Sequence, residues 1–189
     1  MLQTLKRMLF STALITLSFG LTIGQGFNGY YQYPDIHGRT IVFVAEGDLW
    51  TVSTDGGMAQ RITTHPEEEM FPSFSPDGAT IAYSASYEGP MEIYTIPTQG
   101  GLTTRWTYEN DASVANTWTP DGKVVYAARA YSKVPDYQLV TIDPNTKVKE
   151  LVPLSQASEG CYDASGNTVY FVRPAYHRNV TKRYEGGTA

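Results

Sequence analysis

Cysteine is almost absent from this chain, since Cys161 is the only one among 189 residues. A lone cysteine cannot form an intrachain disulfide, so we expect Cys161 to be a small apolar residue in a strand. The three histidines, His37, His65 and His177, lie far apart and lack the spacing of metal ligands. The sequence therefore predicts neither a disulfide-stabilised protein nor a metal site, and no cofactor is expected.

A strong charge of one sign is also missing. The net charge of −5 is small and spread along the chain. Nucleic-acid binding normally requires a basic patch, so we expect no nucleic-acid partner. Beyond the first 26 residues, no segment has the apolar periodicity of an amphipathic helix. These absences leave an all-β protein as the simplest interpretation.

The first 26 residues have the features of a secretory signal peptide. Lys6 and Arg7 precede an apolar stretch over residues 8–23, and Gly24-Gln25-Gly26 supplies small residues for cleavage. The stretch is shorter than the about 20 residues of a typical membrane span. We expect cleavage after residue 26 and a mature part over residues 27–189, exported to the periplasm or secreted, with no membrane contact afterwards. An uncleaved membrane anchor is the alternative.

A turn motif recurs at a fixed spacing of 44 residues. Ser75, Thr119 and Asp163 each begin a copy, and a weaker copy begins at Asp35. Proline presets φ at the second turn position, and Asp-Gly tolerates positive φ at the next two. The residues expected to form these structural turns are Pro76, Asp77, Gly78, Pro120, Asp121 and Gly122.

This period indicates a β-propeller, because about 40–45 residues make one four-stranded blade. Alternating apolar residues follow each turn, as in Thr80–Ser84, and predict strands. The predicted blades cover residues 30–66, 67–112, 113–155 and, incompletely, 156–189. Three and a half blades cannot close a ring, so we expect the chain to be the N-terminal part of a longer protein.

Several segments resemble the opening propeller of the tricorn protease family, and the resemblance extends from about Tyr30 to Ala189. They are Ile36–Gly38, Ile41–Trp50, Arg61–Pro66, Phe74–Gly78 and Thr181–Thr188. The resemblance implies a multidomain serine peptidase, a hydrolase whose first, six-bladed propeller begins in this chain. It also implies peptide or unfolded-protein substrates and a homo-oligomer at full length. The family's catalytic residues would lie beyond Ala189, so no catalytic residue is expected here.

A TolB-like protein is the alternative, because the Pro-Asp-Gly repeat is shared with that family. It would be a non-enzymatic periplasmic propeller that binds protein partners. TolB-like chains carry an α/β domain before the propeller, whereas here the first blade follows the predicted signal almost directly.

Two charged segments are candidate interaction sites. Arg178, Lys182 and Arg183 lie in a long loop of the fourth repeat, where we expect a substrate-rim or interdomain contact. An ordinary surface loop is the alternative. The acidic run at residues 67–69 is expected to be a solvated loop between blades, with an acidic rim patch as its alternative.

Overall fold

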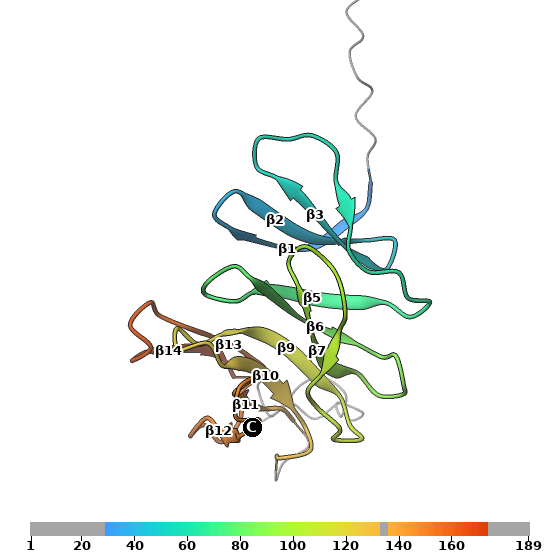
Figure 1. Cartoon of the computed structure of the whole chain (residues 1–189). Coiled ribbons are helices and arrows are strands. Elements are labelled where there is room, and N and C mark those ends of the chain that lie inside the picture. Colours follow the sequence, from blue (N-terminus) through green and yellow to red (C-terminus); the bar gives the residue numbers. More distant parts are fainter. Residues whose placement is uncertain (1–28, 133–135, 174–189) are drawn as a thin grey trace, which may run out of the picture.

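The computed structural model describes residues 29–132 and 136–173, and every regular element in these ranges is a β-strand (Figure 1). The strands form three four-stranded sheets and one two-stranded sheet, all antiparallel. This arrangement confirms the expected all-β fold of four-stranded blades in an incomplete propeller. The first 28 residues, including the predicted signal peptide, lie outside the described ranges.

Each sheet is built from consecutive strands, and we name the sheets blades 1 to 4. Blade 1 contains β1 (Tyr31–His37), β2 (Thr40–Ala45), β3 (Asp48–Ser53) and β4 (Gln60–Arg61). Blade 2 contains β5 (Glu69–Phe74), β6 (Thr80–Ala85), β7 (Glu92–Pro97) and β8 (Thr104–Arg105). Blade 3 contains β9 (Ser113–Trp118), β10 (Val124–Ala128), β11 (Gln138–Ile142) and β12 (Lys149–Leu151). Blade 4 contains β13 (Glu159–Tyr162) and β14 (Val169–Val172) among the described residues.

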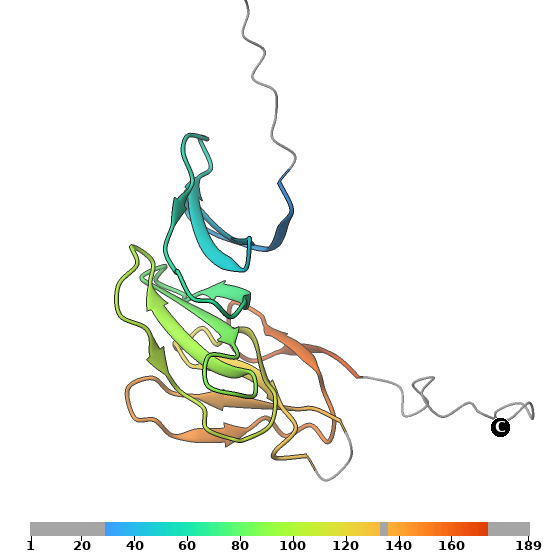
Figure 2. The same ribbon diagram turned by 90° about the vertical axis from the view of Figure 1, so that its right-hand side faces the viewer.

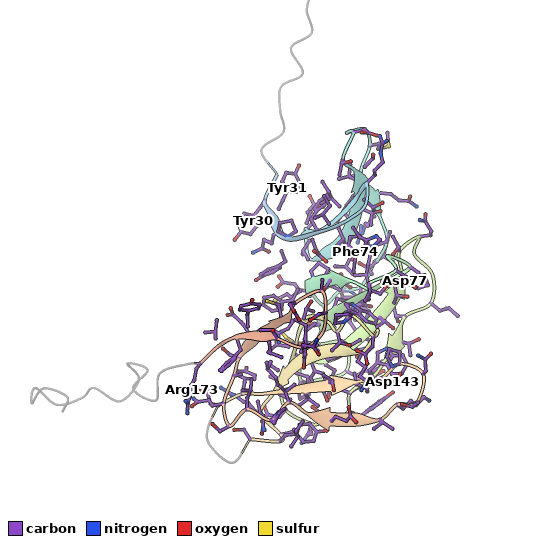
Figure 3. The ribbon with its side chains drawn as sticks, turned by 90° about the vertical axis from the view of Figure 1, so that its left-hand side faces the viewer. Tyr30, Tyr31, Phe74, Asp77, Asp143 and Arg173 are labelled. Carbon is purple, nitrogen blue, oxygen red and sulfur yellow. The ribbon has the colours of Figure 1, made fainter. Side chains whose placement is uncertain are left out.

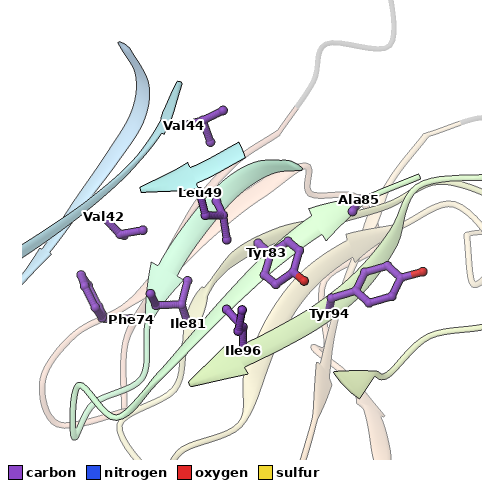
Figure 4. Close-up of a cluster of buried hydrophobic side chains, with 9 residues drawn as sticks. All are labelled: Val42, Val44, Leu49, Phe74, Ile81, Tyr83, Ala85, Tyr94 and Ile96. Carbon is purple, nitrogen blue, oxygen red and sulfur yellow. The ribbon is translucent and has the colours of Figure 1, made fainter. Parts of the chain in front are cut away.

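The blades pack face to face in chain order, as the two orthogonal views show (Figures 1 and 2). Side chains on a strand alternate between its two faces, so each middle blade contributes to two cores. Between blades 1 and 2, for example, Val42 and Leu49 pack against Ile81 and Tyr83, and all four are fully buried (Figure 4). Burial of such side chains contributes roughly 1.5–3 kcal/mol each to stability.

The recurrent Pro-Asp-Gly motif lies in the tight turn between the first and second strands of a blade. The amide of Gly78 donates to the carbonyl oxygen of Ser75 (2.8 Å), and that of Gly122 donates to Thr119 (2.9 Å). Both glycines have positive φ, of 70° and 86°. Pro76, Asp77, Pro120 and Asp121 occupy the intervening positions, and Asp77 accepts a hydrogen bond from the Ser75 hydroxyl (2.6 Å).

The weak copy of this motif at Asp35 is different, and the sequence prediction was wrong there. Residues up to His37 belong to strand β1, and the turn consists of Gly38 and Arg39 alone. Asp35 instead joins blades 1 and 2, because its carboxylate accepts a hydrogen bond from the amide of Phe74 (2.7 Å). By register Ile36 is the counterpart of Phe74, so blade 1 joins its first two strands by a shorter turn than blade 2 does.

Candidate functional site

The innermost strands β1, β5, β9 and β13 surround a hollow of about 840 Å³. In a propeller these strands line the central axis, so the hollow lies where a closed ring would have its channel. Its lining is mostly apolar and aromatic, and residues of β14 complete one wall. Binding sites for other molecules are typically concave, largely apolar and bordered by a few polar groups. The hollow is therefore the candidate site of this chain.

Two aromatic residues form one wall of the hollow. The rings of Tyr33 and Phe71 lie 4.4 Å apart between centroids and are tilted by 50°. Both residues have positive φ, of 50° and 56°, and each precedes a proline, Pro34 or Pro72. Left-handed backbone is unfavourable for an aromatic residue, and the position before proline also disfavours helical conformations. The same strained arrangement occurs in two consecutive blades.

A bulge in the inner strand produces this arrangement in both blades. The pairing register shifts between Gln32 and Asp35 in β1 and between Met70 and Ser73 in β5. A bulge redirects side chains, which is how these aromatic rings come to face the hollow. Strained residues of this kind cluster at functional sites, so they strengthen the case for the hollow.

The opposite wall is mixed: the inner strands of blades 3 and 4 contribute small residues, and Tyr137, Tyr170 and Phe171 lie beside them. The strand register places Ala115 and Asn116 of β9 where blade 2 has Phe71 and Pro72. Strand β13 has no bulge. Gly160 alone takes the place that Phe71 and Pro72 share in blade 2. A Cβ atom on Gly160 would lie 2.4 Å from Leu139, so glycine allows β13 to approach blade 3. The inner strands thus contribute aromatic residues in blades 1 and 2 and residues without rings in blades 3 and 4.

The hollow is poor in groups that could catalyse a reaction. Glu159 is the only charged residue among the described residues that line it, and no described histidine does so. Nucleophilic catalysis by a hydroxyl or thiol needs a base within hydrogen-bond distance and an orienting group. The lining is therefore suited to contact with apolar groups of another molecule.

A second set of polar residues occurs in blades 1 and 2 at a spacing of 44 residues and holds the outer part of each of these two blades. In blade 1 the Arg61 guanidinium pairs with Asp48 and its Nε donates to the Thr63 carbonyl oxygen (2.9 Å). In blade 2 Arg105 does the same with Glu92 (3.3 Å) and Thr107 (2.8 Å).

The threonine hydroxyls in this set accept hydrogen bonds from buried strand amides. The Leu49 amide donates to Thr63 Oγ1 (2.7 Å), and the Ile93 amide donates to Thr107 Oγ1 (2.8 Å). Sequence reasoning missed this set, although the 44-residue spacing of Arg61 and Arg105 was a detectable signal.

Glu69 is a fully buried carboxylate between blades 1 and 2. Its oxygens accept hydrogen bonds from the Tyr87 hydroxyl (2.5 Å) and the Thr63 hydroxyl (2.9 Å). Burial raises the pKa of Glu69 to about 7, because the low-dielectric surroundings disfavour its charge. The acidic run was expected to be a solvated loop, and this was wrong for Glu69, whereas Glu67 and Glu68 are exposed.

Glu109 occupies a similar place between blades 2 and 3 but has a different partner. It accepts hydrogen bonds from Tyr126 (2.9 Å), Tyr131 (2.7 Å) and the Lys149 ammonium (2.9 Å). Burial tends to raise the pKa of Glu109, but the hydrogen bonds from Lys149 and the tyrosines outweigh it and leave the pKa below its usual value. Glu109 is therefore a buried anion that joins two blades. Glu69, in contrast, is a carboxyl group whose pKa lies near neutral pH.

The remaining candidates from the sequence have different outcomes. Arg178, Lys182 and Arg183 lie outside the described residues, so their predicted contact stays a prediction. Cys161 lies in strand β13, and its side chain is exposed. Within residues 29–132 and 136–173, no three histidine, cysteine or acidic residues are grouped as metal ligands would be. No helix in the described part of the chain is long and apolar enough to cross a membrane.

The stacked four-stranded blades and the hollow along their inner strands define this chain as part of a β-propeller. The profile of the family described as "Tricorn protease N-terminal beta propeller domain" matches residues 28–189. The chain therefore belongs to the tricorn protease N-terminal β-propeller family.

Named relatives cover short parts of the chain. Tricorn protease homolog 1 of Streptomyces coelicolor is 34% identical over 64 residues, which are 34% of this chain and 6% of that protein. The putative tricorn-like protease N-terminal subunit of Sulfurisphaera tokodaii is 36% identical over 56 residues. Those residues are 30% of this chain and 29% of the relative, so the two chains are nearly equal in length.

Solved structures show the same fold. A putative TolB from Agrobacterium tumefaciens has a TM-score of 0.67 and 23% identity, over 76% of this chain and 53% of that one. The tricorn protease has a TM-score of 0.64 and 22% identity, over 71% of this chain and 14% of that one. The chain thus spans only a small part of the tricorn protease structure.

Proposed function

We propose that this chain is the N-terminal propeller part of a tricorn-type serine peptidase and that it guides peptide substrates. The family match over residues 28–189 is the observation that carries this proposal. Hydrolysis would take place in domains outside this chain. The propeller would select peptides and support assembly of the homo-oligomeric parent protein.

The chemistry of the hollow supports contact with peptides. The Tyr33–Phe71 wall offers aromatic surface to apolar side chains, and the volume of about 840 Å³ leaves room for several of them. Glu159 is the single carboxylate of the lining among the described residues, so basic groups would be preferred to acidic ones. This combination favours unfolded peptides with exposed apolar residues.

The first test asks whether this chain alone has peptidase activity. Purified residues 27–189 are incubated with fluorogenic peptides that end in basic, acidic or apolar residues, and no turnover above a mock purification is expected. Turnover that is abolished by replacing a serine of this chain would overturn the proposal.

The full coding sequence should contain a PDZ domain and a catalytic core, and a stop codon directly after Ala189 without a partner gene would also overturn the proposal.

The second test addresses the hollow in the full-length peptidase. Phe71→Ala copies the residue that blade 3 has at the same position, Ala115, so the fold should tolerate it. Its KM for peptides with apolar residues should rise while kcat stays unchanged, because catalysis lies elsewhere. Met58→Ala is the control, since Met58 is exposed in a loop away from the hollow. An unchanged KM for Phe71→Ala would remove the hollow from the proposal.

Export is part of the proposal and rests on the leader-like residues 1–26. Cell fractionation of the natural protein should find it outside the cytoplasm. Deletion of residues 2–26 should retain it in the cytoplasm. Unchanged location after the deletion would contradict export through this segment.

A TolB-like binding protein is the second candidate, favoured by the TM-scores of 0.67 and 0.66 with two TolB structures. At 23% and 21% identity these likenesses concern the fold alone. Recovery of an envelope lipoprotein with the purified protein, together with the absence of a peptidase domain in its gene, would favour this candidate.

A further inference from the structure

The first turn of blade 1 places a histidine ring against blade 2. The His37 ring lies over Phe74, with 6.0 Å between ring centroids, and its Nε2 donates to the Pro76 carbonyl oxygen (3.1 Å). The ring also covers Gly78, since a Cβ there would lie 2.1 Å from it. One planar side chain with an N–H donor thus occupies the space beside the Pro-Asp-Gly turn of blade 2.

The corresponding space between blades 2 and 3 is an open groove of about 450 Å³. Trp118, Pro120 and Gly122 line it and are, by the 44-residue spacing, the counterparts of the three residues that the imidazole contacts. By register the counterpart of His37 is Ser75, whose hydroxyl bonds within its own turn instead. Nothing lies within 4 Å of a Cβ at Gly122, so this groove has no ring of its own beside the turn.

Two tryptophans form the apolar side of the groove. Trp106 directly follows β8, and Trp118 is the last residue of β9. Their indole N–H groups donate to the Thr95 hydroxyl (2.8 Å) and to the Ser73 carbonyl oxygen (2.9 Å). Because both N–H groups have partners within the protein, the rings offer apolar and π surface to a ligand. Among aromatic side chains, tryptophan attracts a cation most strongly.

The charge of the groove is negative. Among the described residues that line it, only Asp77 and Asp121 are charged. The Ser75 hydroxyl donates to Asp77 (2.6 Å) and is the largest cause that lowers the pKa of this carboxyl group below its usual value. Lys123 lies 3.9 Å from Asp121 but closer to Glu150, at 2.9 Å. A positively charged ligand is therefore favoured over a neutral one.

The groove lies on the side of the molecule that carries the Pro-Asp-Gly turns. Figure 3 shows Asp77 and Asp143 on this side and Arg173, where the described chain ends, on the other. Asp77, Pro120 and Asp121 are exposed. A long side chain of another molecule can therefore enter the groove from solvent.

We propose that the groove between blades 2 and 3 binds the guanidinium group of an arginine side chain from another polypeptide. A guanidinium is planar and stacks on aromatic rings, so it can pack on Trp118 as the imidazole packs in the neighbouring interface. Its N–H groups can donate to the Pro120 carbonyl oxygen and to the two carboxylates. The inference goes beyond the proposed function, because the groove shares no lining residue with the hollow.

The test uses the full-length natural protein labelled with 5-fluorotryptophan, and the probe is N-acetylarginine methylamide. The ¹⁹F resonance of position 106 is identified by its loss in Trp106→Phe. Blade 1 has Ile62 at this position, with the same backbone hydrogen bond, so the fold should tolerate phenylalanine. The resonance should shift with probe concentration and reach saturation. The citrulline analogue, which is neutral, and the lysine analogue, which is not planar, should both bind more weakly.

The double variant Asp77→Asn/Asp121→Asn should raise the Kd of the arginine probe by roughly tenfold, because two exposed ion pairs are lost. Asparagine is a favoured turn residue and keeps an oxygen that can accept from the Ser75 hydroxyl. Asp55→Asn/Asp163→Asn is the matched control and should leave the Kd unchanged. It removes the same charge from two residues that do not line the groove.

Four outcomes would overturn the proposal. They are a resonance of position 106 that does not respond to the arginine probe, equal affinity for the citrulline analogue, equal affinity for the lysine analogue, and an unchanged Kd in Asp77→Asn/Asp121→Asn. Binding of the probe at a distant site would not shift this resonance. The readout does not depend on peptidase activity, so failure of the proposed function would leave the inference intact.

Discussion

Glu69 shows how a single side chain can make a propeller sensitive to pH. It is fully buried, and its partners Tyr87 and Thr63 are neutral hydroxyl donors. Asp48 nearby raises its pKa further, and Arg61 lowers it, but burial is the largest cause. The interface between blades 1 and 2 therefore contains a carboxyl group that ionises near neutral pH when the protein is folded.

Replacement of Glu69 by glutamine should make stability less dependent on pH. In the unfolded chain Glu69 ionises near its ordinary value of 4.5, whereas the folded pKa is about 7. Because the folded pKa is raised, the stabilisation is complete below pH 4.5 and is lost as pH rises through 7, by roughly 3 kcal/mol. Melting temperatures at pH 5 and pH 8 should differ more for the parent protein than for Glu69→Gln. Equal differences would contradict this assignment.

Gly78 and Gly122 provide a matched comparison of two turns. Both have positive φ, so alanine at either position costs about 1–2 kcal/mol through backbone strain. At Gly78 a Cβ would also lie 2.1 Å from the His37 ring, whereas nothing lies within 4 Å of one at Gly122. His37 would have to move and give up its hydrogen bond to the Pro76 carbonyl (3.1 Å).

Gly78→Ala should therefore be the more destabilising of the two substitutions, by about 1 kcal/mol. Chemical denaturation of the two variants measures the difference. In a His37→Ala background the two substitutions should become equivalent. A difference that persists in that background would rule out the His37 ring as its cause.

At the scale of the strand, the hydroxyl groups of Thr63 and Thr107 stabilise the outer edges of blades 1 and 2. Strands β4 and β8 contain two residues each, so they have few ladder hydrogen bonds of their own. The buried Thr107 hydroxyl links the Ile93 amide to the Glu92 carboxylate. Side-chain contacts thus replace part of a missing ladder.

Thr107→Val should destabilise the protein by about 1–3 kcal/mol, because the Ile93 amide and Glu92 would be left buried without this partner. Thr104→Val is the control, since Thr104 is exposed in β8 and valine favours strands. The measurement is the midpoint of urea unfolding for each variant. Similar midpoints for the two variants would show that the Thr107 hydroxyl contributes little.

The sequence predicted those elements whose cause is local. The Pro76-Asp77-Gly78 turn and the strands beside it depend on neighbouring residues, and they were predicted correctly. Strand β1 was missed because Tyr33-Pro34 interrupts its alternation, and pairing with β2 across a bulge is what makes it a strand. The burial of Glu69 was missed because Thr63 and Tyr87, at distant positions, create it.

The candidate hollow was likewise beyond the sequence alone. Tyr33 and Phe71 are 38 positions apart, and only the bulges bring their rings together. In contrast, the polar set of Arg61 and Arg105 could have been predicted from the same 44-residue spacing that revealed the turns. A repeat should therefore be searched for charged positions as well as for turns.

At the scale of the molecule, the two end blades expose apolar sheet faces. Phe43 and Trp50 lie on one, and Tyr170 and Val172 lie on the other. Large exposed apolar faces and unpaired strand edges favour association. Such faces distinguish an open array of blades from a closed ring.

Residues 27–189 produced alone should be rich in β-structure but prone to aggregation. The double variant Phe43→Thr/Tyr170→Thr should aggregate less, because threonine keeps the strand propensity and removes apolar surface. The control Met58→Thr/Leu102→Thr removes the same amount of apolar character from loops, where Met58 is 95% and Leu102 is 91% exposed. Circular dichroism and light scattering after size-exclusion chromatography provide the measurement. A monodisperse, cooperatively melting parent chain would contradict the prediction. If the double variant is soluble, the substitutions for the stability measurements above are made in it.

The order of strands within each blade also has a consequence for synthesis on the ribosome. Because β1 to β4 are consecutive, blade 1 has all of its strands once residue 61 has emerged, and it borrows none from later in the chain. Each later blade is then added to a surface that already exists, as in other repeat arrays. We therefore expect the blades to form in chain order during synthesis, each on the exposed face of the blade before it.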